Sequence, residues 1–505
     1  MARNIMIQGT MSNVGKSLLC AALCRVLRQD GYRCAPFKSQ NMALNSGVTP
    51  DGLEMGRAQI LQALSAGIEP DVRMNPILLK PTSDHRSQVI VNGKAVGCFS
   101  AREYFARKKE LIPLILSSYA SLAGEADVIV IEGAGSPAEI NLKQDDIVNM
   151  GLARLVDAPV LLAGDIDPGG VFAQLYGTVM LLEEKERRRI KGLIINKFRG
   201  DRTLLEPGIG MLEEKLGIPV AGVLPWLSLS LDEEDSMSVN LKRRTHTKPV
   251  DIAVIRFPRI SNFTDLDPLS AHPMLGVRYV CGTNEFGTPD LILLPGTKST
   301  LADLKWLRET GLEKRIQLSA REGVHILGIC GGYQMLGEVL RDPDNTEGEG
   351  FLPEVRGLGL LPAETCFRKR KTRRRVSGII REGYLSGCSV YGYEIHTGQT
   401  EITAQNRIIS STGFQSAGQK EEESGKALVC ASGNVFGTYL HGLFDSGQAV
   451  DRLADLLAKK KGLPGSGYRS PDRARQRELE LDVLADAFRK NMDMERIRRI
   501  LERKE

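Results

Sequence analysis

The sequence predicts an α/β protein with two doubly wound, mainly parallel-sheet domains and a helical C-terminal extension. Two observations lead to this fold class. Short apolar runs alternate with longer helical patterns in both halves of the chain, which is typical of parallel sheets covered by helices. The 505 residues are also too many for a single hydrophobic core, so the chain should divide into two or three domains.

The N-terminal half contains the first alternation. Helical patterns cover Lys16–Gln29 and Glu54–Ala66, and the apolar runs around them predict strands. The predicted strands of this half are Asn4–Gln8, Arg33–Phe37, Val128–Ile131, Pro159–Ala163, Gly192–Ile195 and Val220–Val223.

The composition changes in the middle of the chain. Residues 227–250 are polar and carry an acidic and then a basic run, which indicates a linker. A second alternation follows, with predicted strands at Asp251–Ile255, Leu291–Leu294, His325–Gly328 and Val435–Thr438. We therefore expect a first domain over residues 1–228, a linker over 229–249, a second domain over 250–447 and a charged helical extension over 448–505.

Composition narrows the class of protein. Hydrophobic residues make up 42% and charged residues 26% of the chain, as in an ordinary globular protein. The net charge of +5 is mild and gives no strong argument for a nucleic-acid partner, so we expect none. The nine cysteines contain no C-x-x-C pair, which favours a reducing compartment over a disulfide framework. No apolar run is long enough for a membrane helix, and no signal peptide precedes the first strand. We expect a cytoplasmic protein without membrane insertion, and its oligomeric state stays open.

The stretch "IQGTMSNVGKS", Ile7–Ser17, is close to a phosphate-binding P-loop. Five residues, Thr10–Val14, separate Gly9 from Gly15, whereas the usual P-loop has four. The stretch lies between a predicted strand and a predicted helix, where backbone N–H groups and a helix N-terminus can converge on phosphate. Lys16 would neutralise phosphate charge and the Ser17 hydroxyl would bind Mg²⁺. The alternative is a glycine turn that happens to carry a lysine.

Other charged residues follow strands of this half and are candidates for the same site. Glu132 ends an apolar strand, where a carboxylate faces the ligand crevice of a parallel sheet. Glu54 is a second candidate metal ligand, and Lys38 a candidate for binding phosphate. A single Glu on a helix is more often simply solvated, and Asp165 and Asp167 are either ligands or turn residues.

The second half contains a candidate nucleophile in "HILGICGGYQMLG". Gly328-Ile-Cys330-Gly-Gly332 is the cysteine counterpart of the nucleophile elbow of hydrolases. The following helix favours the thiolate, and the Gly331 N–H would stabilise an oxyanion together with a donor from the Gly296–Thr297 turn. We select His441, in "TYLHGLFD", as the base. The alternative for Cys330 is an inert buried thiol.

Each half resembles a known family. The first resembles dethiobiotin synthetase, whose P-loop has the same interval; the resemblance implies carboxylate activation by ATP, metal binding by Glu132 and a place for Asn196 near the adenine. The second resembles class I glutamine amidotransferases, in which a Cys and a His release ammonia from glutamine. Those enzymes usually carry a Glu two residues after the His, where this chain has Leu443. What orients His441 is open, with Asp445 or a backbone carbonyl as candidates.

Taken over nearly its whole length, the chain resembles the cobyric acid synthase family. The resemblance rests on the segments "KSQNMALNS", "SQVIVNGK", "IEGAGSPAEINL", "INKFRGD", "ISNFTDLDPL", "LLPGTKSTLADL", "GICGGYQMLG" and "GYEIHTG". It implies amidation of the b, d, e and g carboxylates of adenosylcobyrinic acid a,c-diamide, with ATP, Mg²⁺ and glutamine, in cobalamin synthesis. "QNMALNS" reads as a polar loop, and Gln40, Asn41 and Asn45 are candidates for binding the corrinoid.

Three alternatives stay open at this stage. The chain could be a related amidotransferase that acts on the corrin a and c carboxylates or on a cell-wall glutamate, or a P-loop switch or partition protein.

The run "RKRKTRRR", Arg368–Arg375, reads as a solvated loop. The alternatives are a surface that binds an acidic partner or nucleic acid, or one that steers the polyanionic corrin substrate. His396 fits either active site or a structural role.

Overall fold

The computed structural model describes residues 2–83, 86–231, 248–348, 351–403, 428–465 and 467–504. The chain forms two compact units. The first contains residues 1–43, 53–234 and 477–505, and the second contains residues 44–52 and 235–476. Most of the expected linker, residues 232–247, lies outside the described residues. The domain boundaries expected from the sequence remain a prediction. Residues 44–52 come from the N-terminal part of the chain but belong to the second unit.

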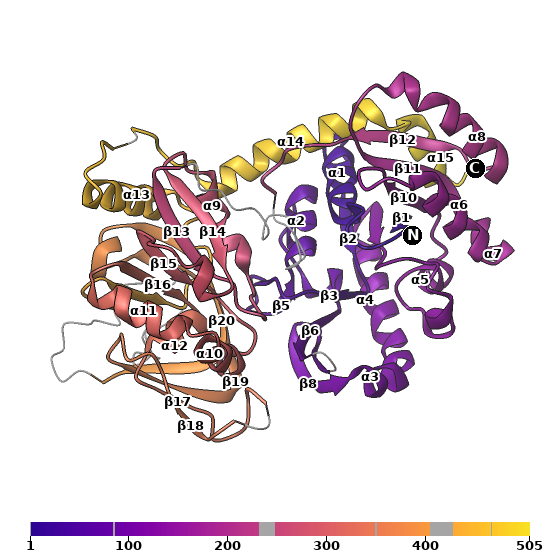
Figure 1. The fold of residues 1–505 in the computed structure, drawn as a ribbon. Coiled ribbons are helices and arrows are strands. Elements are labelled where there is room, and N and C mark those ends of the chain that lie inside the picture. The colour runs from indigo at the N-terminus through magenta and orange to yellow at the C-terminus, as the bar shows by residue number, and fades with distance from the viewer. Residues whose placement is uncertain are drawn as a thin grey trace. The chain divides into compact units, whose positions relative to one another are not determined.

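In the described part of the first unit, six strands form a parallel sheet in the order β12-β11-β10-β1-β9-β2 (Figure 1). All six predicted strands of the N-terminal half are present in this sheet. Their bounds are β1 (Arg3–Gly9), β2 (Cys34–Phe37), β9 (Val128–Glu132), β10 (Val160–Asp165), β11 (Ile190–Phe198) and β12 (Val220–Pro225). The helices of the unit are α1 (Lys16–Gln29), α2 (Arg57–Ala66), α3 (Ala101–Arg107), α4 (Ile112–Glu125), α5 (Met150–Leu155), α6 (Val171–Leu181), α7 (Glu184–Arg187) and α8 (Glu206–Leu216).

Both faces of this sheet are buried. Alternate residues of β1 enter different hydrophobic clusters: Met6 packs with residues of α4 and α6, whereas Ile5 and Ile7 pack with residues of α1. Because successive strand side chains point to opposite faces, a sheet covered on both faces needs a continuous apolar strand sequence. The run "NIMIQG" supplies it, and the result is the doubly wound arrangement that the sequence predicts.

A smaller sheet in the first unit was not predicted. Strand β3 (Gln40–Met42) pairs in parallel with β6 (Ile77–Ser83), which continues in antiparallel order to β7 (Arg86–Val91) and β8 (Lys94–Ser100). The interpretation of Gln40–Ser46 as a polar loop was therefore wrong for its first residues, because the alternation of one buried residue between more exposed ones in β3 is too short to recognise in the sequence. Residues 54–56 are strand β5 (Glu54–Gly56), and the helix begins only at Arg57.

The second unit is built on a sheet in the order β14-β13-β15-β16-β22-β21 among its described residues, parallel except for the β22–β21 pair. All four predicted strands of this half are in the sheet. Its strands are β13 (Val250–Ile255), β14 (Leu275–Val280), β15 (Leu291–Leu294), β16 (His325–Ile329), β21 (Val429–Ser432) and β22 (Val435–Thr438). Its helices are α9 (Asp267–Ala271), α10 (Thr300–Glu309), α11 (Leu312–Arg321), α12 (Gly331–Leu336) and α13 (Gln448–Lys460).

The basic run lies in a strand, so its interpretation as a loop was wrong. Strand β19 (Ala363–Ile379) pairs antiparallel with β20 (Ser389–Ile402), with an irregularity between Phe367 and Thr372. Two short strands, β17 (Val339–Arg341) and β18 (Glu354–Arg356), complete this sheet. Arg374 forms an ion pair of 2.8 Å with Glu394 on the paired strand. The cross-strand pairing offsets the repulsion within the run, which the sequence alone does not reveal.

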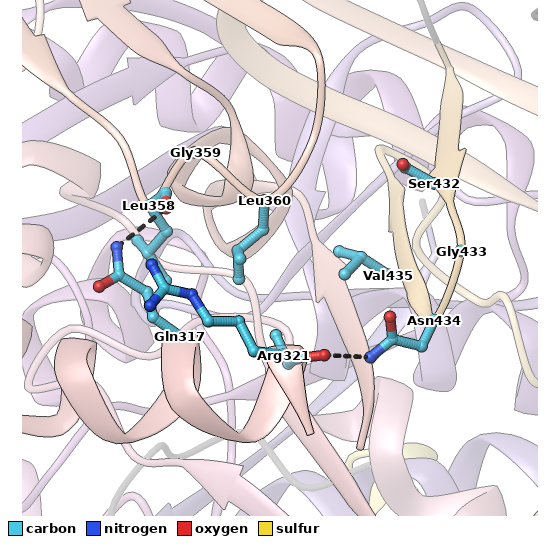
Figure 2. A pocket seen from close by; sticks show the side chains of 10 residues that line it. Gln317, Arg321, Leu358, Gly359, Leu360, Ser432, Gly433, Asn434 and Val435 are labelled. Atoms are coloured by element: carbon cyan, nitrogen blue, oxygen red, sulfur yellow. Dashed lines mark hydrogen bonds between the residues drawn. The ribbon is translucent and has the colours of Figure 1, made fainter. Parts of the chain in front are cut away.

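A pocket of ≈ 390 Å³ opens in the second unit between α11, the turn before β22 and the loop around Leu358 (Figure 2). Gln317 and Asn434 both face backbone carbonyls there: Gln317 Nε2 donates to Leu358 O at 3.0 Å and Asn434 Nδ2 to Ala320 O at 2.9 Å. None of the site residues selected from the sequence lines it.

The C-terminal helices are α13, α14 (Arg473–Asn491) and α15 (Met494–Leu501). Leu453 and Leu457 of α13 pack in the core of the second unit. From Arg477 onward the chain belongs to the first unit, where Leu481 and Phe488 of α14 pack with α1 and Arg25 forms ion pairs with Glu478 and Asp482. The extension is thus part of both cores, which explains its amphipathic helices.

The predicted fold class is confirmed: the protein is mixed α/β with mostly parallel sheets and a helical C-terminal region. Among the helices of the described ranges, none combines the length and the hydropathy that crossing a membrane requires. All nine cysteines are free thiols.

Candidate functional site

The glycine-rich loop connects β1 to α1, as the P-loop interpretation requires. Gly15 has a φ of 93°, a left-handed conformation that favours glycine. A Cβ on Gly9 would lie 2.5 Å from Val14 Cγ2 and 3.0 Å from Lys16 Nζ, so only glycine permits the tight path there. Lys16 Nζ donates to Met11 O at 2.9 Å and to Gly135 O at 3.2 Å. The lysine head is therefore held over the loop that would surround a phosphate.

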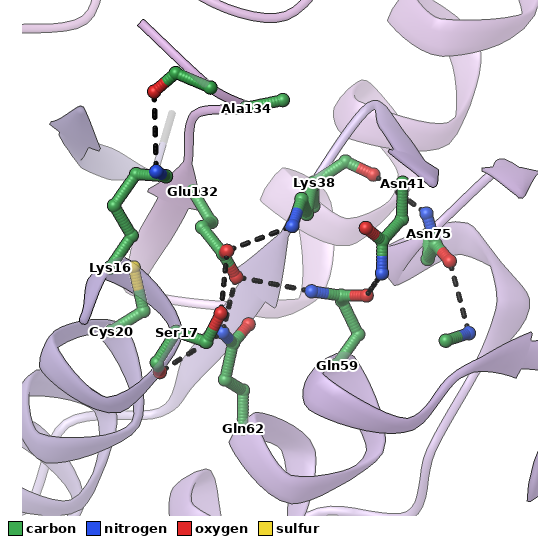
Figure 3. A network of polar contacts seen from close by, with 12 residues as sticks. Lys16, Ser17, Cys20, Lys38, Asn41, Gln59, Gln62, Asn75, Glu132 and Ala134 are labelled. Carbon is green, nitrogen blue, oxygen red and sulfur yellow. Dashed lines mark hydrogen bonds and ion pairs between the residues drawn. The ribbon is translucent and has the colours of Figure 1, made fainter. Parts of the chain in front are cut away.

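Glu132, at the end of β9, is the centre of a buried polar network (Figure 3). Its Oε1 accepts from Ser17 Oγ and from Lys38 Nζ, both at 2.8 Å. Its Oε2 accepts from Gln62 Nε2 at 2.6 Å and Gln59 Nε2 at 3.1 Å. Four donors thus fix a carboxylate beside the first turn of α1. A serine hydroxyl and a carboxylate next to a phosphate loop are the oxygen ligands that Mg²⁺ uses with nucleotides.

The remaining candidates of the first unit lie on and around this network. Asn196 Nδ2 donates to Val14 O at 2.8 Å, so Asn196 supports the loop itself. Thr10 Oγ1 donates to Gln174 Oε1 at 3.2 Å. Glu54 forms a buried ion pair of 2.9 Å with Lys80. Of the three candidate metal ligands, Ser17 and Glu132 contact each other directly, and Glu54 has this separate partner.

The two aspartates at and just after the end of β10, Asp165 and Asp167, have structural partners. Asp165 forms an ion pair of 2.7 Å with Lys197, and Asp167 one of 3.0 Å with Arg199. The Asp167 N–H also donates to Asp165 Oδ1 at 2.9 Å, as in a capped turn. Within the described residues, no group of three or more His, Cys, Asp or Glu side chains is arranged to hold a metal ion.

The three candidates for binding substrate do not lie in one unit. Asn41 Nδ2 donates to Gln59 Oε1 at 2.9 Å and so joins the Glu132 network. Gln40 Oε1 accepts from Tyr104 Oη at 2.6 Å. Asn45 belongs to the second unit and is buried.

Cys330 lies at the junction of β16 and α12, on a strained turn. Its backbone has φ 51° and ψ −109°, a combination that is unfavourable for a residue with a side chain and is found at functional sites. The flanking glycines are required by close packing, since a Cβ on Gly332 would lie 2.0 Å from Leu294 O and one on Gly328 2.6 Å from Leu336 Cδ1. The elbow predicted from the sequence is present.

His441 is the histidine that contacts Cys330, and its orienting partner is Asp265. His441 Nδ1 lies 2.7 Å from Asp265 Oδ2, and Asp265 Oδ1 accepts from the Gly442 N–H at 3.0 Å. Burial disfavours the charged imidazole, but the Asp265 carboxylate and the hydrogen bond with Cys330 outweigh it and raise the pKa of His441 from 6.5 to about 10. Nε2 is therefore the nitrogen that can exchange a proton with the thiol.

Asp265 was not among the residues selected from the sequence. It is 176 positions from His441, in the short 3₁₀ turn after Asn262, and no spacing rule connects the two. The only signal was its place within "ISNFTDLDPL", one of the segments that carry the resemblance to the cobyric acid synthase family. Asp445 lies beside Gly442, while the Nδ1 position is taken by Asp265.

The backbones of Gly331 and Thr297, the two expected oxyanion donors, lie next to each other. Gly331 is the first residue of α12, where helix geometry leaves the N–H without an intrahelical acceptor. A Cβ on Gly331 would lie 3.2 Å from the Thr297 nitrogen, so the Thr297 amide is adjacent. The Thr297 hydroxyl donates to the buried Asp303 carboxylate and lies 3.1 Å from Arg259 O, which holds the turn.

His396 has partners on both ring nitrogens. Nδ1 lies 2.6 Å from Gly398 O and Nε2 lies 3.3 Å from Glu394 Oε2. Its ring stacks on Tyr439, with 3.6 Å between centroids. These contacts support the structural role rather than a catalytic one.

Comparison with known proteins agrees with this geometry. Residues 5–239 match the CobQ/CobB/MinD/ParA nucleotide binding domain, and residues 251–449 match the CobB/CobQ-like glutamine amidotransferase domain. A cobyric acid synthase of Lachnoclostridium phytofermentans is 53% identical over 99% of this chain and 99% of its own length. Those of Ruminiclostridium cellulolyticum and Citrobacter koseri are 53% and 50% identical, over 99% of this chain and 98% and 99% of their own lengths.

A nucleotide-binding domain joined to a glutamine amidotransferase domain defines an ATP-dependent, glutamine-hydrolysing amide synthetase, which is a carbon–nitrogen ligase. The matches confirm the predicted nucleotide-binding domain in the first half of the chain and the predicted glutamine amidotransferase domain in the second. Within that class, the chain belongs to the cobyric acid synthase family.

Proposed function

We propose that the protein amidates the b, d, e and g carboxylates of adenosylcobyrinic acid a,c-diamide to give adenosylcobyric acid in cobalamin biosynthesis, using ATP and glutamine. The observation that carries the proposal is the near-full-length match, at 53% identity, to cobyric acid synthases. The contacts of His441 with Cys330 and Asp265 support it.

The geometry of the second unit supports a mechanism for glutamine hydrolysis. The Cys330 thiolate attacks the side-chain amide carbon of glutamine, and the Gly331 and Thr297 N–H groups stabilise the oxyanion that forms. Protonated His441 gives its Nε2 proton to the departing nitrogen, which leaves as ammonia, and a glutamyl thioester remains on Cys330. Neutral His441 then removes a proton from water, which attacks the thioester and releases glutamate while Asp265 holds the ring.

Carboxylate activation takes place in the first unit. A carboxylate is a poor electrophile at neutral pH, so transfer of the γ-phosphoryl group of ATP to its oxygen supplies a leaving group. The loop N–H groups from Gly9 to Gly15 and the Lys16 ammonium would bind the phosphates. Lys38 would approach the transferred group. Ammonia then attacks the acyl phosphate, giving an amide, phosphate and a proton.

Ser17 and Glu132 fit a magnesium ion. Their oxygens already lie 2.8 Å apart beside the loop, and the four donors around Glu132 fix its position. When bound with the nucleotide, Mg²⁺ would neutralise charge on the phosphate oxygens. Glu54 remains a weaker candidate, because its carboxylate pairs with Lys80.

The substrate assay tests this proposal. Purified protein is incubated with the a,c-diamide, Mg-ATP and glutamine carrying an isotope label in its amide nitrogen, and products are analysed by mass spectrometry. We expect four successive incorporations of the label. Incorporation into the a and c positions of unamidated cobyrinic acid, or into a cell-wall glutamate, with none into the a,c-diamide would contradict the proposal.

A further inference from the structure

Residues 44–52 come from the N-terminal half of the sequence but pack within the second unit. Their strand β4 (Ser46–Val48) lies against β19 and β20. Val48 packs with Tyr393 and Ile395 in a small buried cluster, and Arg375 Nε donates to Val48 O at 3.4 Å. The Ile395 carbonyl is in turn 3.9 Å from Cys330 Sγ. A single residue, Ile395, therefore contacts both this segment and the Cys330 thiol.

Both backbone polar groups of Ser46 are bound by residues that contact His441. The Ser46 N–H donates to Asn262 Oδ1 at 3.1 Å, and the Ser46 carbonyl accepts from Tyr393 Oη at 2.9 Å. Tyr393 stacks on the His441 ring, with 5.3 Å between centroids and 23° between planes. Asn262 Nδ2 lies 3.4 Å from His441 Nε2. All four residues are buried.

The bond from Ser46 decides which way the Asn262 amide faces. An amide has one accepting oxygen and one donating nitrogen, so accepting the Ser46 N–H with Oδ1 turns the NH₂ group toward His441. A donor at Nε2 competes with the Cys330 thiol for the same lone pair, and it opposes the N–H of protonated His441. Rotating the amide would favour the thiolate–imidazolium pair, but it would also place two donors, Nδ2 and the Ser46 N–H, against each other.

We propose that Ser46 restrains the glutaminase base: by fixing the Asn262 amide and the Tyr393 ring, it keeps an N–H donor against His441 Nε2, where that donor competes with Cys330, until residues 44–52 move. Asn262 and Tyr393 are thus positioning residues. This inference rests on the proposed glutaminase function of Cys330 and His441, and it adds a control of that site.

The ends of the segment lead to the other site along the chain. Gln40 and Asn41 precede it, and Asn41 belongs to the Glu132 network. Glu54 follows it, in the buried pair with Lys80. Nucleotide or corrinoid binding at those residues would act on both ends of the segment through the backbone, so glutamine hydrolysis would increase when an acceptor is ready.

Asn262→Asp tests the proposal most sharply. A carboxylate still accepts the Ser46 N–H but presents an acceptor instead of a donor to His441 Nε2. With the corrinoid and ATP absent, we expect faster alkylation of Cys330 by iodoacetamide and a several-fold rise in glutamine hydrolysis, since one hydrogen bond corresponds to roughly a twofold to tenfold change. The second variant is Asn262→Gly. Asn262 has a φ of 51°, which glycine adopts readily, so this variant keeps the backbone and removes the amide. Its rates of alkylation and glutamine hydrolysis should rise similarly.

Tyr393→Phe and Tyr391→Phe form a matched pair on β20. The first loses the bond to Ser46 and keeps the stacked ring, whereas the second loses a 3.0 Å bond to Asp472. We expect Tyr393→Phe alone to raise the glutamine consumed per ATP, with ammonia-dependent synthesis unchanged in both. If wild-type protein hydrolyses glutamine in the complete reaction but Asn262→Asp, Asn262→Gly and Tyr393→Phe are unchanged or slower without acceptor, the restraint is wrong. If wild-type protein hydrolyses no glutamine at all, the proposed function itself fails.

Discussion

Asp265 Oδ2 lies 2.7 Å from His441 Nδ1, and the same carboxylate accepts the Gly442 N–H through its other oxygen at 3.0 Å. One aspartate therefore fixes both the ring and the backbone of His441, the proposed base. We propose that Asp265 takes the role that a glutamate two residues after the histidine has in the class I amidotransferases that the second half resembles, a position that Leu443 occupies here.

Replacing Asp265 should disable glutamine use selectively. In Asp265→Asn the amide can stabilise the wrong tautomer of His441 and does not stabilise the imidazolium, so kcat for glutamine hydrolysis should fall by about 10²–10⁴. Ammonia-dependent synthesis should persist. Asp445→Asn is the control, since Asp445 is the nearby carboxylate that does not contact Nδ1. An equal loss in the two variants would contradict the assignment of Asp265.

The glycine-rich loop and the Cys330 elbow could be predicted because each is a local motif. The Gly-rich loop and the Cys330 elbow each combine a strand end, a helix start and glycines within a few residues, so the sequence reports them directly. Contacts between distant residues are not visible in this way. Asp265 and His441, or Ser46 and Asn262, meet only because the sheet brings their strands and turns together. Strand β19 was hidden because its charged run masks the alternation that its pairing with β20 satisfies.

The raised pKa of His441 predicts a pH dependence of stability. The folded-state pKa of about 10 lies above the ordinary 6.5, so between these values the folded protein binds a proton that the unfolded chain does not. The stabilisation is complete below pH 6.5 and is lost as the pH rises through about 10. The measurement is the difference in thermal midpoint between wild type and His441→Gln across this range. That difference should shrink with rising pH, and a difference that grows would contradict the ionised pair.

The phosphate loop predicts a different pattern of loss. Lys16→Ala removes a charge that would contact phosphate, so synthesis should fall by at least about 10² with either glutamine or ammonia as the nitrogen source. Alkylation of Cys330 should be unaffected. Rates are measured as ADP release and amide formation, and synthesis that survives with ammonia would place the activation step elsewhere.

Lys38 and Glu132 form a buried ion pair. Removing one charge of the pair should destabilise the protein, and removing the other charge as well should restore part of the stability. Their side chains are 5% and 1% exposed and 2.8 Å apart. Glu132→Gln removes the charge that faces the buried ammonium, which should lower the free energy of unfolding by about 3–5 kcal/mol. The double variant with Lys38→Met should recover much of it. Urea unfolding monitored for the first unit measures both, and a double variant no more stable than Glu132→Gln would refute the coupling.

Under the proposed function, Cys330 releases from glutamine the nitrogen that the phosphate-loop unit attaches to the corrinoid. The most direct measurement follows amide formation on the a,c-diamide by Cys330→Ala, with Mg-ATP and either labelled glutamine or ammonia, beside wild type. We expect the variant to form no amide from glutamine and to form amides from ammonia at close to the wild-type rate. Glutamine-dependent amidation by the variant, or loss of ammonia-dependent amidation in a variant that remains folded, would contradict it.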